Sequence, residues 1–295
     1  MNQKDTNQQH LFRVWLALLI VATGHLFSAR QAQAETIRLA PLPMESRETQ
    51  VRQFRPLALY LEDQLKVKVE LVFSEGYQEL LEKFINNGID LAYLGPLPYV
   101  ELKAQYAKAE PLVHFNEASG KPAYTCSIIA VADTPLSLHN IHGQKIALTQ
   151  PLSTCGYLAV HGLFKEHGSS LEANRYAYLD KHDAVALAVV RGDFSLGGVK
   201  TAIAKKYSHL GLRVIAETGP MPSFGLVANT ATLPPQRTEA ITALLSHLDP
   251  TGADKDMLAT WGENLQYGAV KATDQDYDLI RRFKDGITIP TANKE

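Results

Sequence analysis

The chain has 295 residues, 45% of them hydrophobic, and a formal net charge of −2 at pH 7. This length accommodates one large or two modest globular domains, and the near-neutral charge without a basic run argues against a nucleic-acid-binding protein. A small anionic ligand would need a local binding site, because the charge of the whole chain does not attract it.

Residues 1–34 have the features of a secretory signal peptide. A positively charged segment precedes an apolar run at 14–22, and the tripeptide at 32–34, Ala-Gln-Ala, places small residues where a signal peptidase cleaves. The apolar run is short for a transmembrane span. We expect cleavage after Ala34 and a mature protein that is free of the membrane in a bacterial periplasm.

The first part of the mature chain alternates strands and helices. Hydrophobic periodicity predicts strands at 36–42, 67–73 and 89–94 and helices at 51–65 and 77–87. This order favours a parallel sheet with crossover helices.

A second unit follows a strand at 110–115 and a turn-rich loop at 118–122. Its predicted strands are 124–131, 145–149, 176–179, 194–199 and 212–217, and its predicted helices are 157–165 and 182–191. A strand at 225–229 returns to the first sheet, and helices follow at 235–248, 256–261 and 277–283. The pattern predicts two α/β lobes joined by two hinge crossings, the first lobe being residues 35–120 plus 224–295 and the second residues 121–223.

A polar turn, Ser153-Thr154-Cys155-Gly156, lies between the strand at 145–149 and the helix at 157–165. A strand followed by a small-residue turn and a helix presents unpaired N–H groups and the positive end of the helix dipole to an anion. The two hydroxyls add hydrogen-bond donors. A purely structural N-cap is the alternative, because serine and threonine are common at that position.

Three segments are informative together: DLAYLGPLPY at 90–99, the Ser153–Gly156 turn, and the histidine-headed HDAVALA at 182–188. In this order and spacing they resemble the periplasmic phosphonate-binding proteins of ABC transporters. The resemblance covers nearly the whole mature chain and implies a two-lobed type II periplasmic-binding-protein fold. Each lobe is then a mixed sheet flanked by helices.

The implied function is capture of a small phosphorus oxyanion, namely a phosphonate, phosphite or phosphate, for an ABC permease. We expect no cofactor and no catalysis, and a monomer as the working form. No histidine, aspartate and glutamate cluster has the spacing of a metal site.

The resemblance also implies a set of ligand-binding residues. Tyr77, Tyr124, Ser153, Thr154 and His182 match the family's ligand-contacting positions, Cys155 replaces a third serine of the turn, and Tyr93 is a further candidate for lining the cleft. The acidic residues that hold the amino group of an aminophosphonate fall near Ala202 and Phe224. A smaller ligand therefore fits better, because an ammonium group would have no partner in the cleft. Lys200 is interpreted as a surface residue more readily than as an added charge.

The two cysteines, Cys126 and Cys155, leave three interpretations open. In an oxidising compartment they could form a structural disulfide, or they could be buried inert thiols. They could also be soft-ligand thiols, because a thiol at a helix N-terminus has a lowered pKa. That third interpretation resembles the arsenite-binding periplasmic sensors of the same family, which signal to a two-component histidine kinase.

An enzyme is the remaining hypothesis. Cys155 and His182 could be a nucleophile and a base. No third residue that would orient the imidazole is evident, and a histidine that only donates a hydrogen bond is the simpler interpretation. We expect that the protein is not an enzyme.

Overall fold

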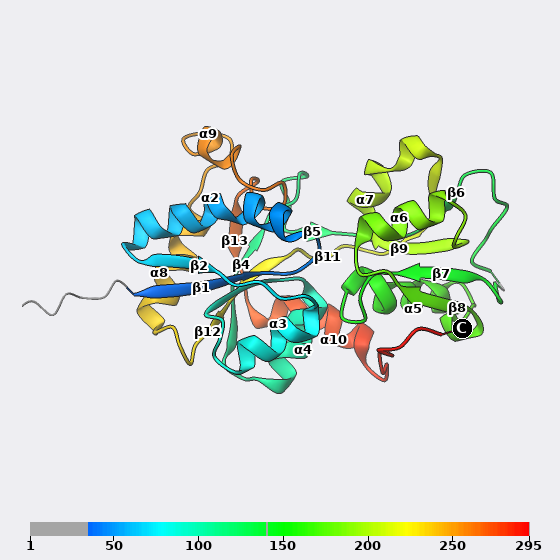
Figure 1. The fold of residues 1–295 in the computed structure, drawn as a ribbon, viewed down its shortest axis with the longest axis horizontal. Helices are drawn as coiled ribbons and strands as arrows, with labels where there is room; N and C mark the ends of the chain where they lie inside the picture. The colour runs from blue at the N-terminus through cyan, green and yellow to red at the C-terminus, as the bar shows by residue number, and fades with distance from the viewer. Residues whose placement is uncertain (1–34, 140, 295) are drawn as a thin grey trace, which may run out of the picture. The chain divides into compact units, whose positions relative to one another are not determined.

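A computed structural model describes residues 35–139 and 141–294, so the expected signal peptide at 1–34 lies outside the described residues. Two mixed β-sheets, each flanked by helices, organise the described chain (Figure 1). This arrangement confirms the predicted α/β class. Among the described residues, none of the helices is both long and apolar enough to cross a bilayer.

The first lobe is built on a six-stranded sheet in the order β13-β4-β12-β3-β1-β2. Its strands are β1 (Thr36–Pro41), β2 (Lys68–Leu71), β3 (Leu91–Leu94), β4 (Ala109–Phe115), β12 (Gly225–Asn229) and β13 (Ala269–Lys271). Strand β1 is parallel to β2 and β3, whereas β12 is antiparallel to both β3 and β4. Its helices are α2 (Arg47–Leu65), α3 (Tyr77–Ile85), α4 (Pro96–Gln105), α8 (Pro235–Ser246), α9 (Lys255–Leu258) and α10 (Asp278–Lys284). Figure 1 shows α2 on one side of the sheet and α3 and α4 on the other.

The second lobe is built on a five-stranded sheet in the order β10-β6-β9-β7-β8. Its strands are β6 (Cys126–Val131), β7 (Lys145–Leu148), β8 (Arg175–Tyr178), β9 (Leu196–Lys200) and β10 (Leu212–Glu217), and its helices are α5 (Ala159–Glu166), α6 (His182–Val190) and α7 (Thr201–Lys206). Consecutive strand residues pack on opposite faces, because side chains alternate along a strand. Ile128 packs in the cluster that contains α5, and Ile129 in the cluster that contains α6 and α7.

The two crossings between the lobes pair with each other. Strand β5 (Ala123–Tyr124) runs antiparallel to β11 (Met221–Pro222). These two short strands are the expected hinge crossings. The lobe boundaries at residues 120 and 224 stay a prediction.

The C-terminal residues make a further passage that the sequence did not suggest. After α10 the chain reaches β8 of the second lobe, where Lys294 and Tyr176 form an isolated antiparallel bridge. Tyr178 adds hydrogen bonds to the Asn293 side chain at 2.9 Å and to the Pro290 carbonyl at 2.6 Å. The chain end therefore covers an edge strand that would otherwise be open.

Several elements differ from the sequence-based expectation for identifiable reasons. Helix α2 begins at Arg47 and not at residue 51, because the Ser46 hydroxyl caps it by accepting from the Thr49 N–H at 3.3 Å. The strand expected at 124–131 is broken at Thr125, whose hydroxyl donates to Thr201 at 2.8 Å. Helices α4 and α7 and strand β13 were not predicted.

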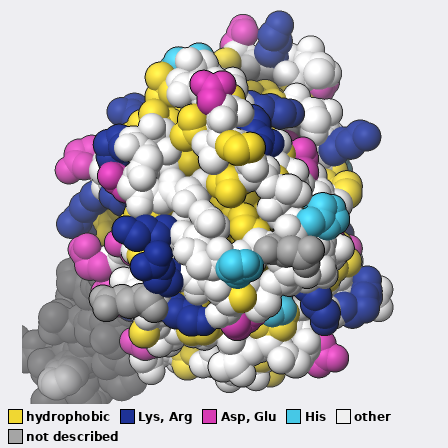
Figure 2. Space-filling model, turned by 90° about the vertical axis from the view of Figure 1, so that its right-hand side faces the viewer, with side chains coloured by type: hydrophobic (Ala, Val, Ile, Leu, Met, Phe, Trp, Pro, Cys, Tyr) yellow, Lys and Arg dark blue, Asp and Glu magenta, His cyan; other side chains and the backbone are white. Residues whose placement is uncertain are grey.

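Charged side chains of both signs are interspersed on the face of the second lobe that Figure 2 shows. That face has no single area of one charge, which would attract a polyanion by a global field.

Candidate functional site

A small cavity of about 10 Å³ lies between the two lobes. The first lobe and the crossings contribute Leu42, Tyr77, Gly95, Pro98, Tyr124 and Phe224 to its lining, and the second lobe contributes Ser153, Thr154, Cys155, His182 and Lys200. This volume is close to the minimum that holds one water-sized group. Six of the seven predicted site residues are brought together here, and Tyr93 is not.

Several helices begin at this cavity. Tyr77 is the first residue of α3, Gly95 is the N-cap of α4, and His182 is the first residue of α6. Thr154 begins the helical turn that leads into α5. The first N–H groups of a helix have no partner within it, and they give its N-terminus a partial positive charge. The cavity therefore lies where several such partial charges meet, which favours an anion.

The Ser153–Gly156 turn enters its helix differently from the expectation. A π-helical turn, Thr154–Leu158, comes first, and α5 begins only at Ala159. Gly156 has non-helical angles, φ −81° and ψ −120°. A Cβ at this position would lie 2.8 Å from Thr149 Oγ1 and 2.9 Å from the Gln150 carbonyl oxygen. The turn requires glycine because the backbone approaches its neighbours so closely.

Two side chains of the second lobe form hydrogen bonds with helix starts of the first. The Thr154 hydroxyl accepts from the Leu97 N–H of α4 at 3.0 Å, and Gln150 Oε1 accepts from the Tyr77 N–H of α3 at 3.1 Å. Gln150 Nε2 also donates to the Pro43 carbonyl at 3.4 Å. These bonds connect the lobes beside the cavity. Gln150 was not predicted, since a single glutamine after a strand has no distinctive pattern.

His182 presents a neutral imidazole to the cavity. Its Nδ1 accepts a hydrogen bond from the Lys200 backbone N–H at 3.2 Å, which leaves the ring proton on Nε2. Burial, and then the positive charge of Lys200, lower the pKa of His182 to about 4. The ring can therefore donate from Nε2 at neutral pH without carrying a charge.

The depressed pKa of His182 predicts a pH dependence of stability. Below pH 6.5 this ring is protonated in the unfolded chain, whereas in the folded chain it stays neutral until about pH 4. Stability is therefore complete above pH 6.5 and falls by up to roughly 3 kcal/mol as the pH drops toward 4.

Chemical denaturation of wild type and His182→Gln at neutral and acid pH measures this loss. In the variant, the part of the acid-induced loss of unfolding free energy that comes from His182 should be absent. An NMR titration of His182 near its ordinary pKa would contradict the prediction.

Two tyrosines that line the cavity also carry hydroxyl groups that can donate hydrogen bonds. Tyr77 and Tyr124 are 3% and 6% exposed. Burial raises the pKa of both phenols well above the ordinary value. Both hydroxyls therefore stay protonated and can donate to an anion.

Tyr93 lies behind the cavity wall, so its expected place in the lining is wrong. It is 1% exposed on the central strand β3, and its ring stacks on that of Phe224 with centroids 5.4 Å apart. Phe54 and Phe115 enclose it further, at 5.0 and 5.9 Å. Phe224, which lines the cavity, fills the space between Tyr93 and the site.

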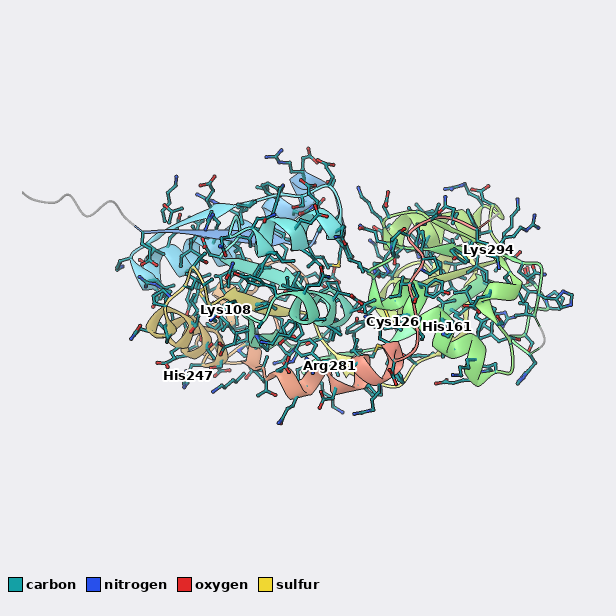
Figure 3. All side chains as sticks on the ribbon, turned by 90° about the horizontal axis from the view of Figure 1, so that it is seen from below. Lys108, Cys126, His161, His247, Arg281 and Lys294 are labelled. Atoms are coloured by element: carbon teal, nitrogen blue, oxygen red, sulfur yellow. A yellow bond between two sulfur atoms is a disulfide. The ribbon has the colours of Figure 1, made fainter. Side chains whose placement is uncertain are left out.

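Cys126 and Cys155 form a disulfide, with their Cα atoms 5.1 Å apart. Figure 3 shows Cys126 at the side of the second lobe nearest the first. The bond ties β6 to the turn that contains Thr154. The interpretations as inert thiols or as soft-ligand thiols are therefore wrong for this structure, because a disulfide sulfur has no thiolate to offer a soft ligand.

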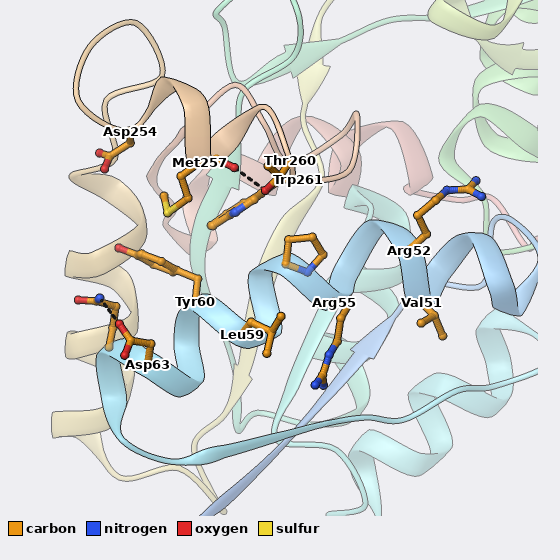
Figure 4. A pocket seen from close by; sticks show the side chains of 12 residues that line it. Val51, Arg52, Arg55, Leu59, Tyr60, Asp63, Asp254, Met257, Thr260 and Trp261 are labelled. Atoms are coloured by element: carbon orange, nitrogen blue, oxygen red, sulfur yellow. Dashed lines mark hydrogen bonds between the residues drawn. The ribbon is translucent and has the colours of Figure 1, made fainter.

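A larger hollow of about 890 Å³ lies elsewhere, beside α2 (Figure 4). Its lining comes from residues 51–64 and 254–261 and includes Arg52, Arg55 and Trp261. None of the predicted site residues lies there, and the second lobe contributes nothing to it. We therefore assign the candidate site to the small cavity between the lobes. In the described part of the chain, no group of three or more histidine, cysteine, aspartate and glutamate side chains is placed to hold a metal ion.

Comparison with known sequences relates this architecture to one family. The profile of the family described as "ABC transporter, phosphonate, periplasmic substrate-binding protein" matches residues 39–277. A phosphate-import protein, PhnD, of Mycolicibacterium smegmatis is 29% identical over 275 residues, which cover 85% of each chain.

Solved structures share the fold at low sequence identity. PhnD1 of Prochlorococcus marinus, solved in complex with methylphosphonate, is 16% identical with a TM-score of 0.74, over 85% of this chain and 97% of that one. The binding protein of an ABC phosphonate transporter of Pseudomonas aeruginosa is 19% identical with a TM-score of 0.72, over 85% and 86%. These similarities confirm the two-lobed type II fold.

Proposed function

The chain belongs to the periplasmic substrate-binding proteins of phosphonate ABC transporters, and we propose that the cavity between its lobes is where it binds a small phosphorus oxyanion. Ser153, Thr154, Tyr77 and Tyr124 would donate from their hydroxyls, and His182 from Nε2. First-turn amides of α3 and α6 would complete the set of donors. Helix α4 offers none, because Pro96 and Pro98 have no N–H and the Leu97 N–H is bonded to Thr154.

The convergence of helix N-termini on a cavity lined by neutral donors is the observation that carries this proposal. A tetrahedral oxyanion offers several acceptor oxygens, and each donor left without one would cost roughly 1–3 kcal/mol. Such a site distinguishes ligands by the number and direction of their acceptors.

The charge of the lining residues limits the ligand further. Among the described residues, no aspartate or glutamate lines the cavity, and Phe224 fills one position where an acid was expected from the family. An ammonium group inside the cavity would have no carboxylate partner. We therefore propose phosphate, phosphite or a simple alkylphosphonate as the ligand, in preference to an aminophosphonate.

A neighbouring hollow is lined by acidic residues, so binding experiments should include an aminophosphonate. It measures about 140 Å³, shares His182, Lys200 and Phe224 with the cavity, and is lined by Glu45, Asp183 and Glu263 among others. A ligand tail that left the cavity would meet these carboxylates.

The proposed role is capture and delivery without any chemical change in the ligand. The signal peptide at 1–34, cleaved after Ala34, would deliver the protein to the periplasm. The lobes would close on the ligand by a hinge motion at β5 and β11, and the permease would receive it. We propose a monomer as the working form.

Titration calorimetry of the mature protein tests this proposal. We expect binding of phosphate, phosphite or methylphosphonate and weaker binding of 2-aminoethylphosphonate, because the cavity itself offers no acid. Tighter binding of 2-aminoethylphosphonate would contradict the proposed ligand class, and no binding of any of the four would contradict the proposed function.

A further inference from the structure

Lys200 is the single lysine, arginine, aspartate or glutamate that lines the cavity within the described part of the chain. It is the last residue of β9, and its backbone N–H also orients His182. Its side chain is only 12% exposed. A lysine so far removed from water is uncommon, because its ammonium group loses hydration that other groups must replace.

Three groups surround the Lys200 ammonium. Nζ lies 2.8 Å from Glu117 Oε2, 5.3 Å from the centroid of the Tyr124 ring and 5.5 Å from that of Phe224. Both ring distances are within the range of a cation–π interaction. Glu117 follows β4 and is not part of the cavity lining. The ammonium therefore lies against two rings that line the cavity, and the carboxylate that pairs with it belongs to a residue outside the lining.

We propose that Lys200 selects ligands by charge, favouring a doubly ionised phosphorus oxyanion over a singly ionised oxyanion of the same shape. This inference rests on the proposed function. Attraction to a fixed ammonium grows with the charge of the ligand. Hydrogen bonds from hydroxyls, imidazole and amides depend more on where the acceptor oxygens lie. Phosphonates and sulfonates share a tetrahedral shape but differ in charge.

A matched pair of ligands separates charge from shape. Methylphosphonate is doubly ionised at mildly alkaline pH, whereas methanesulfonate carries a single charge. We expect wild type to prefer methylphosphonate in titration calorimetry. Lys200→Met should lower methylphosphonate affinity on the order of 10-fold, because the ligand loses its attraction to a nearby ammonium group. It should lower methanesulfonate affinity by less, because that ligand carries a smaller charge. The ratio of the methylphosphonate affinity to the methanesulfonate affinity should therefore fall.

Lys206→Met is the control for a general loss of positive charge. Lys206 lines the neighbouring hollow but not the cavity, and its Nζ pairs with Asp183 at 3.2 Å. Its replacement should leave the ratio of the two affinities unchanged. If the ratio fell as much in Lys206→Met as in Lys200→Met, a specific role for Lys200 would be contradicted.

Replacing Lys200 alone leaves Glu117 without its cationic partner, and that variant could be unstable. Lys200→Met combined with Glu117→Gln removes both charges, and it should lower the ratio of the two affinities in the same way. Glu117→Gln alone retains the ammonium group, so the ratio should stay the same or rise. An unchanged ratio in both variants that lack Lys200 would overturn the inference while leaving the proposed function in place. Failure of wild type to bind either methylphosphonate or methanesulfonate would overturn the inference, and the titration with phosphate, phosphite and 2-aminoethylphosphonate would then decide the proposed function.

Discussion

Replacing Thr154 by valine should lower the affinity for methylphosphonate or phosphate roughly 10- to 100-fold, which corresponds to about 1.4–2.8 kcal/mol. The Thr154 hydroxyl is buried, and it accepts from the Leu97 N–H of the opposite lobe at 3.0 Å. Valine has the same shape but no hydroxyl. It therefore leaves that amide unpaired and removes a donor from the ligand.

Thr149→Val is the matched control. The Thr149 hydroxyl is fully buried five residues earlier in the same segment, and it has no hydrogen-bond partner. Its loss should change neither affinity nor unfolding free energy by much, since no bond is broken. Calorimetry of both variants, with denaturation curves to verify folding, measures the difference. Equal affinities for wild type and Thr154→Val would remove Thr154 from the site.

Removing the disulfide should cost roughly 3–4 kcal/mol of unfolding free energy, from the loop-closure entropy of a bridge of this length. Cys126 and Cys155 are 29 residues apart in sequence, and both are almost fully buried. A serine at each position leaves the unfolded chain with more freedom. It also leaves the turn containing Thr154 without its covalent attachment to β6.

Urea denaturation of the double variant Cys126→Ser/Cys155→Ser, compared with wild type in the presence and absence of reductant, measures this cost. We expect reduced wild type to resemble the variant. The oxidised protein should not bind arsenite, since it has no thiolate there. An unfolding free energy that is equal in all three samples would contradict a stabilising role for the bridge.

Much of the fold could be predicted because hydrophobic periodicity reports directly on buried faces. The strand that ends at Asn229 and the helix that begins at His182 follow the predicted positions. Helix α4 was missed because Pro96 and Pro98 lie in its first turn, where proline is compatible with a helix but breaks the apolar pattern. The C-terminal passage to β8 could not be predicted, since it depends on a few hydrogen bonds of Pro290, Asn293 and Lys294 that follow no periodic pattern.

Some residues of the site could be predicted from the sequence and others could not. The turn residue Thr154 could be found because turn chemistry is local, and His182 could be found only through the family resemblance. Gln150 and Lys200 could not, because only the packing of the two lobes places them at the cavity. Tyr93 was misplaced since a tyrosine at a strand end has the same local pattern whether it faces a cleft or the core.

We propose that a phosphorus oxyanion binds between the lobes, where helix N-termini converge. A crystal structure of the mature protein grown with methylphosphonate would show whether it does. We predict electron density for the phosphonate within hydrogen-bonding distance of the Thr154 hydroxyl and of His182 Nε2, with the lobes closed around it. Density for the ligand at any other place, with this cavity filled by protein side chains, would contradict the claim.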